Sequence, residues 1–336
     1  MTRRWVLIAA AAALVVAGAF VALRVLGPPA YENPIMSHDA PDPSIIYADG
    51  FYWAYTTQSE WSEFTNLPIL RSKDLVEWSF VGDALPKLPK WVTTDTWAPH
   101  ISRIGDRYVL YYSAMQYGRA GFGIGVATSD SPEGPFEDSG GPILRGPGFT
   151  TIDPFVYTTS EGDHYIYWGS NSVPIKAQQL SDDGLTVVGK PQSVLQPSDD
   201  DYENLIEGPW LVEHDDYFYL MYSGDACCHP GPHYAVLVAR STSAFGPFEK
   251  YEGNPILESN DDFFAPGHNS TIRDESGRDW ILYHSYVGNE DDVFLGEESD
   301  TRALMLDLIE WENGWPVIND GHGPSVSSDV APDVSG

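Results

Sequence analysis

The sequence predicts an all-β fold, a five-bladed β-propeller, and three observations support this prediction. Aromatic residues make up 13% of the 336 residues, glycine and proline are frequent, and segments with helical periodicity are scarce. This composition is typical of many short strands joined by tight turns. Five segments of the chain share one pattern, and the pattern returns at a nearly constant interval. Within each segment, two strands of aromatic and branched residues flank a short polar turn, as in a β-hairpin.

Each repeat begins with a motif of proline or polar residues and continues into an alternating strand, a turn and a second, aromatic strand. In the first repeat the strands lie on either side of the turn Ala48-Asp49-Gly50. Equivalent positions in the five opening motifs are marked by Asp42, Pro99, Asp153, Glu207 and His268. Successive markers are 54 to 61 residues apart, which is the spacing of propeller blades. We therefore expect one propeller domain over residues 30–319, with one four-stranded blade for each repeat.

Third strands repeat as well. Residues 123–129 resemble residues 235–241, and both segments run on into Gly-Pro-Phe, at 134–136 and 246–248. Trp53 and Trp168 stand in the aromatic second strands, where we expect them to form the core between blades.

The two ends of the chain are set apart from the repeats. Arg3 and Arg4 precede an uncharged apolar run from Trp5 to Leu23, so residues 1–29 are expected to be a signal peptide or a membrane anchor. Positive residues before the run place the remainder outside the cytoplasm, and the paired arginines resemble a twin-arginine export signal. Export to the exterior or the cell surface is thus expected, with cleavage left open. Residues 320–336 are rich in Gly, Ser, Pro and Asp, and we expect an acidic, disordered tail.

The charge is strongly acidic, with 18 basic against 49 acidic residues and a net charge of −31. Such a balance repels nucleic acid and anionic lipid, which excludes both as partners of the folded domain. A dispersed acidic surface also suits a protein that works in high salt, where screening removes the self-repulsion. A halophilic source is therefore expected, and an ordinary acidic secreted protein is the alternative.

The only two cysteines are adjacent, Cys227 and Cys228. Without a histidine cluster at ligand spacing they do not predict a zinc site. In an oxidising compartment they can form a disulfide between neighbours, and two unpaired thiols are the alternative.

Acidic markers in three repeats point to a functional centre. First strands of propeller blades line the central channel, so Asp42, Asp153 and Glu207 are expected to meet on the axis although they are far apart in sequence. Burying three like charges together is unfavourable, because they repel one another in a low dielectric. A chemical role for these carboxylates is therefore expected.

Six motifs occur along the chain in a fixed order. They are Asp42-Pro43-Ser44-Ile45-Ile46, Trp97-Ala98-Pro99-His100, Ile152-Asp153-Pro154, Glu207-Gly208-Pro209-Trp210, Gly267-His268-Asn269-Ser270 and Arg302-Ala303-Leu304-Met305-Leu306. Each motif alone is weak, but their order and spacing together are specific. By these motifs, the chain from about Tyr31 to Asn319 resembles glycoside hydrolase family 43.

The resemblance implies roles for the three acids. Asp42 would be the general base that activates water, and Glu207 the general acid that protonates the leaving oxygen. Asp153 would hold Glu207 and raise its pKa. Such a pair hydrolyses a glycosidic bond with inversion when the carboxyl groups are about 6.5–9.5 Å apart, leaving room for the water.

Three further positions follow from the same resemblance. His268 would face a central ion, often calcium, either directly or through water, and no organic cofactor is implied. Arg302 would contact the sugar near the catalytic acid, and Trp97 would line the sugar pocket. Their structural alternatives are a hydrogen-bonded core histidine, an ordinary ion pair and packing within the blade.

The resemblance implies hydrolysis of plant polysaccharides or oligosaccharides that contain arabinose or xylose. Arabinan-active enzymes are favoured over β-xylosidases because Gly-His-Asn-Ser resembles the arabinan-active branch. A carbohydrate-binding propeller without catalysis is one alternative. Another is a retaining, fructoside-active propeller enzyme, which would carry Arg-Asp-Pro in blade three, where this chain has Ile152 before Asp153.

Overall fold

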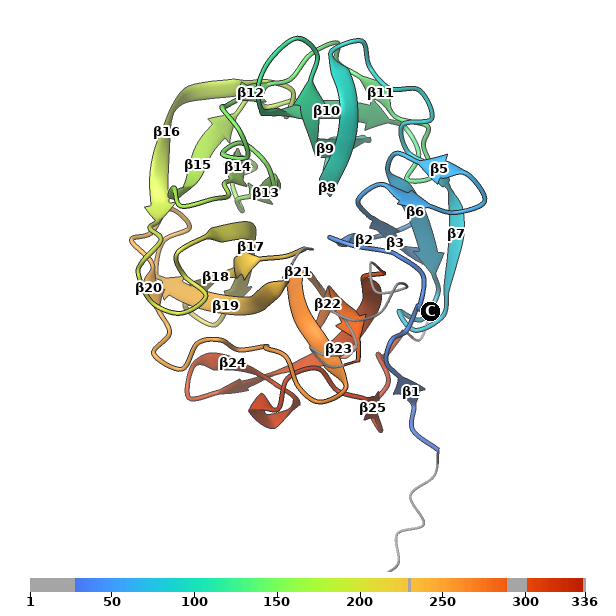
Figure 1. Ribbon diagram of the computed structural model, residues 1–336, viewed down its shortest axis with the longest axis vertical. Helices are drawn as coiled ribbons and strands as arrows, with labels where there is room; N and C mark the ends of the chain where they lie inside the picture. Colours follow the sequence, from blue (N-terminus) through green and yellow to red (C-terminus); the bar gives the residue numbers. More distant parts are fainter. Residues whose placement is uncertain (1–27, 229–230, 289–300, 335–336) are drawn as a thin grey trace, which may run out of the picture.

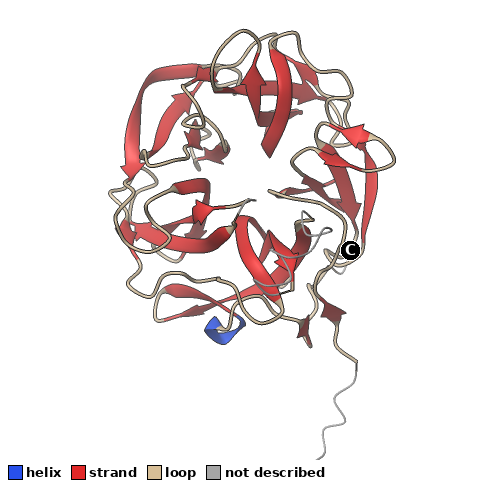
Figure 2. Cartoon of the chain, viewed as in Figure 1, coloured by secondary structure: helices blue, strands red, loops and turns tan. Residues whose placement is uncertain are grey.

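The computed structural model describes residues 28–228, 231–288 and 301–334. Within these residues the elements are strands joined by turns and loops, and the one helical segment is a short 3-10 turn, η1 (Asn319–Gly321), drawn in blue in Figure 2. Five antiparallel sheets stand around a common centre in chain order, and each is one blade (Figure 1). The predicted five-bladed β-propeller is confirmed.

The strands of each blade run outward from the centre in sequence order. Blade 1 consists of β2 (Ser44–Ala48), β3 (Phe51–Tyr55), β6 (Pro68–Ser72) and β7 (Trp78–Asp83). Blade 2 consists of β8 (Val92–Ile104), β9 (Arg107–Gln116), β10 (Phe122–Ser129), β11 (Glu137–Asp138) and β12 (Leu144–Arg145). Blade 3 consists of β13 (Phe155–Thr158), β14 (His164–Trp168), β15 (Ile175–Leu180) and β16 (Val187–Leu195). Blades 4 and 5 consist of β17 (Ile206–His214), β18 (Tyr217–Ala226), β19 (His233–Ser241) and β20 (Glu249–Lys250), then β21 (Phe263–Arg273), β22 (Asp279–Val287), β23 (Ala303–Glu312) and β24 (Trp315–Ile318).

The hydrophobic core lies between blades. Five clusters of buried side chains each join two neighbouring blades, so the ring contains one cluster for every interface. Middle strands such as β9 and β18 are buried on both faces because a blade packs against each side of them. This explains their nearly continuous apolar runs. Trp53 and Trp168 are both buried in these clusters, as expected.

One backbone feature recurs at the inner edge of every blade. A residue with positive φ stands in or just before each first strand, and the five are Asp42, Ala98, Asp153, Gly208 and His268. Four of the five are not glycine, and such residues usually avoid this conformation, at a cost of about 1–3 kcal/mol each. In β8, β17 and β21 the pairing register shifts at this position, so the strand is bulged there. Bulges re-aim side chains, and in these three blades they set the inner edge that faces the central site.

The ring closes through both ends of the described chain. β1 (Tyr31–Glu32) pairs with β25 (Ser327–Ser328) outside blade 5 (Figure 1). The Asn33 side chain donates to the carbonyl oxygens of Leu306 and Ser325, at 2.9 and 3.0 Å. The segment from β1 to Asn33, called the N-terminal strap below, therefore lies against both blade 5 and the C-terminal segment.

The C-terminal segment differs from the disordered tail that we expected over residues 320–336. Residues 320–334 are held by β25, by the Asp333 N–H that donates to Asp274 at 3.0 Å, and by Arg278, which donates to the Ala331 carbonyl at 2.8 Å. For these residues the expectation of disorder is wrong. Polar composition suggested a loose tail, but backbone pairing with the N-terminal strap orders it.

The expected signal or anchor, residues 1–29, lies almost wholly outside the described residues. Among the residues that the structure describes, no helix has the length and apolar character needed to cross a membrane. Anchoring through the N-terminal segment stays a prediction.

Candidate active site

A pocket of about 660 Å³ opens at the inner ends of the blades. Its lining includes all six residues singled out from the sequence, and these are Asp42, Trp97, Asp153, Glu207, His268 and Arg302. The propeller therefore brings together side chains contributed by all five blades.

Asp42 is buried and surrounded by donors. Thr57 donates to its Oδ2 at 2.5 Å, and Arg302 Nη1 lies 3.4 Å from its Oδ1. Burial alone would raise the pKa of Asp42, but the charge of Arg302, and that of His268 in the acid range where its ring is protonated, lower this pKa well below its ordinary value. The carboxyl group is therefore ionised at neutral pH and able to accept a proton from water.

The pKa of Glu207 is displaced in the opposite direction from that of Asp42. Ser170 donates to its Oε2 at 2.5 Å, and the Tyr234 hydroxyl donates to its Oε1 at 2.9 Å. Burial raises the pKa of Glu207 to about 7 despite these hydrogen bonds, and the charge of Asp42 adds to the rise. Near neutral pH, Glu207 is thus able to hold a proton and to give it up.

Asp153 lies beside Glu207 and shares its protonation. The backbone N–H of Gly208 donates to Asp153 Oδ2 at 3.1 Å. Burial first, and then the charge of Glu207, raise the pKa of Asp153 well above its ordinary value. The two acids interact strongly, so their protons belong to the pair. Gly208 has φ +56°, and a Cβ there would lie 3.3 Å from His268, so a larger residue would crowd the ring.

His268 lies between two of the acids. Its Nδ1 is 3.4 Å from Asp42 Oδ1 and 3.8 Å from Asp153 Oδ2. Burial lowers the pKa of His268, so the ring is neutral at neutral pH. Calcium takes six to eight oxygen ligands, whereas the described part of the chain holds no group of three or more His, Cys, Asp or Glu arranged around a metal. These side chains do not by themselves fit a directly bound ion, and calcium near His268 stays a prediction.

Arg302 lies among carboxyl groups, whereas Trp97 lies beside another aromatic ring. The Arg302 backbone N–H donates to Asp39 at 2.9 Å, and its side chain is buried against Asp42. Trp97 is half-buried, and its ring is parallel to that of Phe149 at 6.2 Å between centroids. Phe149 is 48% exposed and lines the same pocket, so it extends the aromatic side of the site.

A ring of hydrogen bonds between blades supports the site, and sequence comparison of the first strands missed it. At four of the five inner positions, the backbone N–H donates to a side chain of the preceding blade around the ring; the four acceptors are His284 for Asp42, Thr57 for Ala98, Ser113 for Asp153 and Ser223 for His268. At the remaining position the preceding blade instead uses Ser170, which donates to the Glu207 carboxyl group. Each of these five side chains stands 15 to 17 residues after its own blade's inner position. Aligning second strands as well as first strands would have found them.

The adjacent cysteines also line the pocket. Cys227 and Cys228 are joined by a disulfide, which decides between the two alternatives left open by the sequence.

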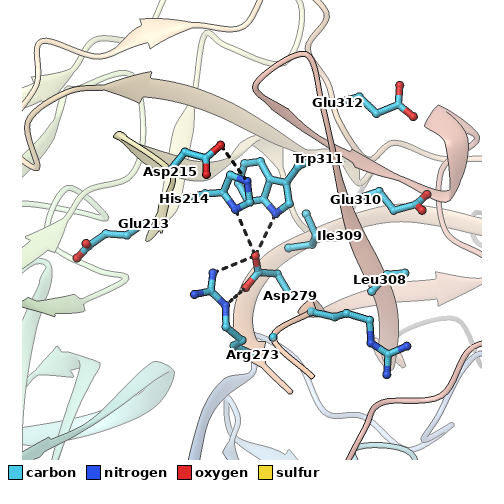
Figure 3. Close-up of a pocket in the computed structure, with 12 residues that line it drawn as sticks. Glu213, His214, Asp215, Arg273, Asp279, Leu308, Ile309, Glu310, Trp311 and Glu312 are labelled. Carbon is cyan, nitrogen blue, oxygen red and sulfur yellow. Dashed lines mark hydrogen bonds and ion pairs between the residues drawn. The ribbon is translucent and has the colours of Figure 1, made fainter. Parts of the chain in front are cut away.

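A second pocket, of about 770 Å³, lies at the far end of β17 from Glu207. There the His214 and Trp311 rings stack at 3.7 Å between centroids. Asp279 accepts hydrogen bonds from Trp311 and from Nε and Nη2 of Arg273 (Figure 3). These polar groups satisfy one another, so this pocket is a junction between blades 4 and 5. It contains none of the predicted site residues.

Comparison with known proteins adds to this geometry. The family model described as "Glycosyl hydrolases family 43" matches residues 31–316. A probable arabinan endo-1,5-alpha-L-arabinosidase A of Aspergillus flavus is 28% identical, over 89% of this chain and 98% of that protein. A xylan 1,3-beta-xylosidase of a Vibrio species is also 28% identical, over 88% of this chain and 58% of that protein. The solved structure of a thermostable family 43 glycoside hydrolase superposes with a TM-score of 0.75 at 27% identity, over 90% of this chain and 99% of that one.

Proposed function

The chain belongs to glycosyl hydrolase family 43, and from this premise we propose that it is an exported, inverting hydrolase of arabinose-containing polysaccharides or oligosaccharides. The observation that supports the proposal most is the opposite displacement of two carboxyl pKa values within one pocket. Hydrolysis with inversion needs an ionised base and a protonated acid at the same time.

In the proposed reaction, Asp42 takes a proton from a water molecule while the oxygen of that water attacks the anomeric carbon. The bond from that carbon to the leaving oxygen breaks, and Glu207 gives its proton to this oxygen. The anomeric carbon inverts because water attacks from the face opposite the leaving group. Asp153 raises the pKa of Glu207, while Arg302 keeps Asp42 ionised and lies where it can contact the sugar. Trp97, with Phe149 beside it, offers apolar ring surface to the sugar.

The substrate preference rests on the relatives. The arabinosidase of Aspergillus flavus aligns over nearly its whole length, which favours arabinan. The Vibrio xylosidase aligns at equal identity over 58% of its length, and it supports a β-xyloside as the second candidate substrate.

Export and salt adaptation are part of the proposal. The apolar run after Arg3 and Arg4 supports export, and the disulfide suits an oxidising exterior. The net charge of −31 supports work in high salt.

The test is a substrate panel in molar salt, with calcium and after EDTA. It contains debranched arabinan, arabinoxylan, and the nitrophenyl arabinofuranoside and xylopyranoside. We expect release of arabinose-containing sugars whose first-formed anomer, followed by NMR, is inverted. A retained anomer would favour the fructoside-type alternative, and oligosaccharide binding in calorimetry without turnover would favour a binding module.

The same panel tests the two acids. Glu207→Gln and Asp42→Asn should each lower kcat by about 10²–10⁴-fold, because each removes one proton transfer. Both replacements keep the shape of the side chain, so unchanged thermal unfolding serves as the control. A variant with more than a tenth of the wild-type kcat would contradict the assigned role of that residue.

A further inference from the structure

The disulfide between Cys227 and Cys228 is placed at the reaction centre and has no role in the mechanism above. It follows directly after β18 and lines the pocket that holds Asp42, Asp153 and Glu207. It therefore lies on the wall of the candidate active site.

On one side the disulfide contacts the surroundings of the base. Arg302 Nη1 lies 3.7 Å from Cys228 Sγ and 3.4 Å from Asp42 Oδ1. The guanidinium therefore lies against both the sulfur and the carboxylate. Since Arg302 contributes the largest of the charges that lower the pKa of Asp42, a group that holds its side chain also affects the proposed base.

On the other side the disulfide contacts the surroundings of the acid. Cys227 packs against a small apolar cluster composed of Tyr234, Phe264, Ala265 and Tyr286. The Tyr234 hydroxyl in turn donates to Glu207 at 2.9 Å. The two cysteines thus connect the neighbours of both catalytic carboxylates.

The disulfide is apolar and therefore suits the C–H surface of a sugar ring, which carboxylates do not bind. A sugar ring presents C–H surface as well as hydroxyl groups, and pockets combine apolar walls with a few placed polar groups. Paired sulfurs are apolar and have no strong donor. Because neighbouring residues are joined, neither side chain can rotate on its own, and little conformational entropy is left to lose on binding.

Resting on the function proposed above, we propose that the Cys227–Cys228 disulfide is a fixed apolar wall of the subsite that binds the pentose next to Asp42 and Glu207, and that it keeps Arg302 against Asp42. It is thus a substrate-contacting and positioning element of the hydrolase.

The test compares oxidised wild type, wild type reduced with TCEP, and the double variant Cys227→Ser/Cys228→Ser. With an arabino-oligosaccharide as substrate, we expect KM to rise about tenfold in the reduced enzyme and in the double variant, as for a lost contact of roughly 1.4 kcal/mol. The turnover number should change by less than KM does. Reoxidation should restore KM, and TCEP should leave the double variant unchanged, which controls for the reagent.

Binding measured separately from turnover keeps the proposal testable even where a variant folds poorly. In the Glu207→Gln background, calorimetry should show about tenfold weaker oligosaccharide binding after reduction. Equal KM and equal affinity before and after reduction would overturn the proposal, also where the unfolding temperature falls, because the disulfide would then be structural only. An oxidised wild type that cleaves no substrate on the panel overturns the proposed function instead, so the two failures are distinguishable.

Discussion

Asp42 and Glu207 carry the same functional group in the same pocket, yet the protein displaces their pKa values in opposite directions. Burial acts on both carboxyl groups and favours the neutral form. At Asp42 the nearby charges of Arg302 and His268 outweigh burial, whereas the donors around Glu207 are the uncharged hydroxyl groups of Ser170 and Tyr234. The difference between the proposed base and the proposed acid therefore comes from the neighbours of each group.

The role of Asp153 leads to a prediction on pH dependence. Activity needs protonated Glu207, so it should fall as pH rises through the pKa of this group, which is about 7. Asp153 and Glu207 interact strongly, and in the role proposed above an ionised Asp153 adds to the rise of the Glu207 pKa. Asp153→Asn should therefore lower that pKa and move the alkaline limb of the kcat/KM profile to lower pH. The variant should therefore lose more activity at neutral pH than at low pH.

The matched control for this pH profile is Asp42→Asn, which should lower activity across the whole range. An alkaline limb at the same pH in Asp153→Asn and wild type would contradict the tuning role.

At the scale of elements, the five inner residues with positive φ, three of them at strand bulges, and the hydrogen bonds between blades create the site together. The inner end of a blade places its carboxylate or histidine. At four positions a side chain in or just after the second strand of the preceding blade accepts a hydrogen bond from the backbone N–H there. Local strand pairing alone would leave the angle between blades free. These contacts link one blade to the next, so they fix the positions of the carboxylates relative to one another around the axis.

The C-terminal segment gives a prediction at the same scale. Deleting residues 319–336 would remove β25, the Ser325 contact of Asn33 and the Asp333 contact of Asp274. With each hydrogen bond contributing about 1 kcal/mol net, we expect the free energy of unfolding to fall by at least about 2 kcal/mol. Thermal and urea unfolding measure the change.

Val330→Ser is the control for the deletion, because this side chain is exposed and should alter stability little. A deletion variant as stable as wild type would show that ring closure does not depend on this segment.

At the scale of the whole molecule, the charge balance dominates the response to solvent. The net charge is −31, and the excess negative charges repel one another in the compact state. Salt screens this repulsion, with a Debye length of about 10 Å at 0.1 M and about 3 Å at 1 M. We therefore expect the unfolding temperature to rise as NaCl increases from 0.1 to 2 M.

Screening depends on ionic strength and not on which monovalent cation supplies it, so KCl should produce the same rise as NaCl. A flat or falling unfolding temperature would contradict adaptation to salt and leave an ordinary acidic secreted enzyme.

The sequence by itself determined the fold and the membership of the site. Blades are local units, and a repeat of alternating strands and turns identifies them without knowledge of their neighbours. The same repeat placed Asp42, Asp153 and Glu207 at equivalent inner positions, and the structure brings them into one pocket.

Only the tertiary structure decided how those residues are held and charged. Ser170, Tyr234 and His284 reach the carboxylates from other strands or other blades. The pKa values depend on burial, which no local pattern encodes. The disulfide and the ordered C-terminal segment likewise depend on what lies across the ring. Short-range patterns specify each blade, whereas the environment of a charge is set by groups that meet only when the ring is closed.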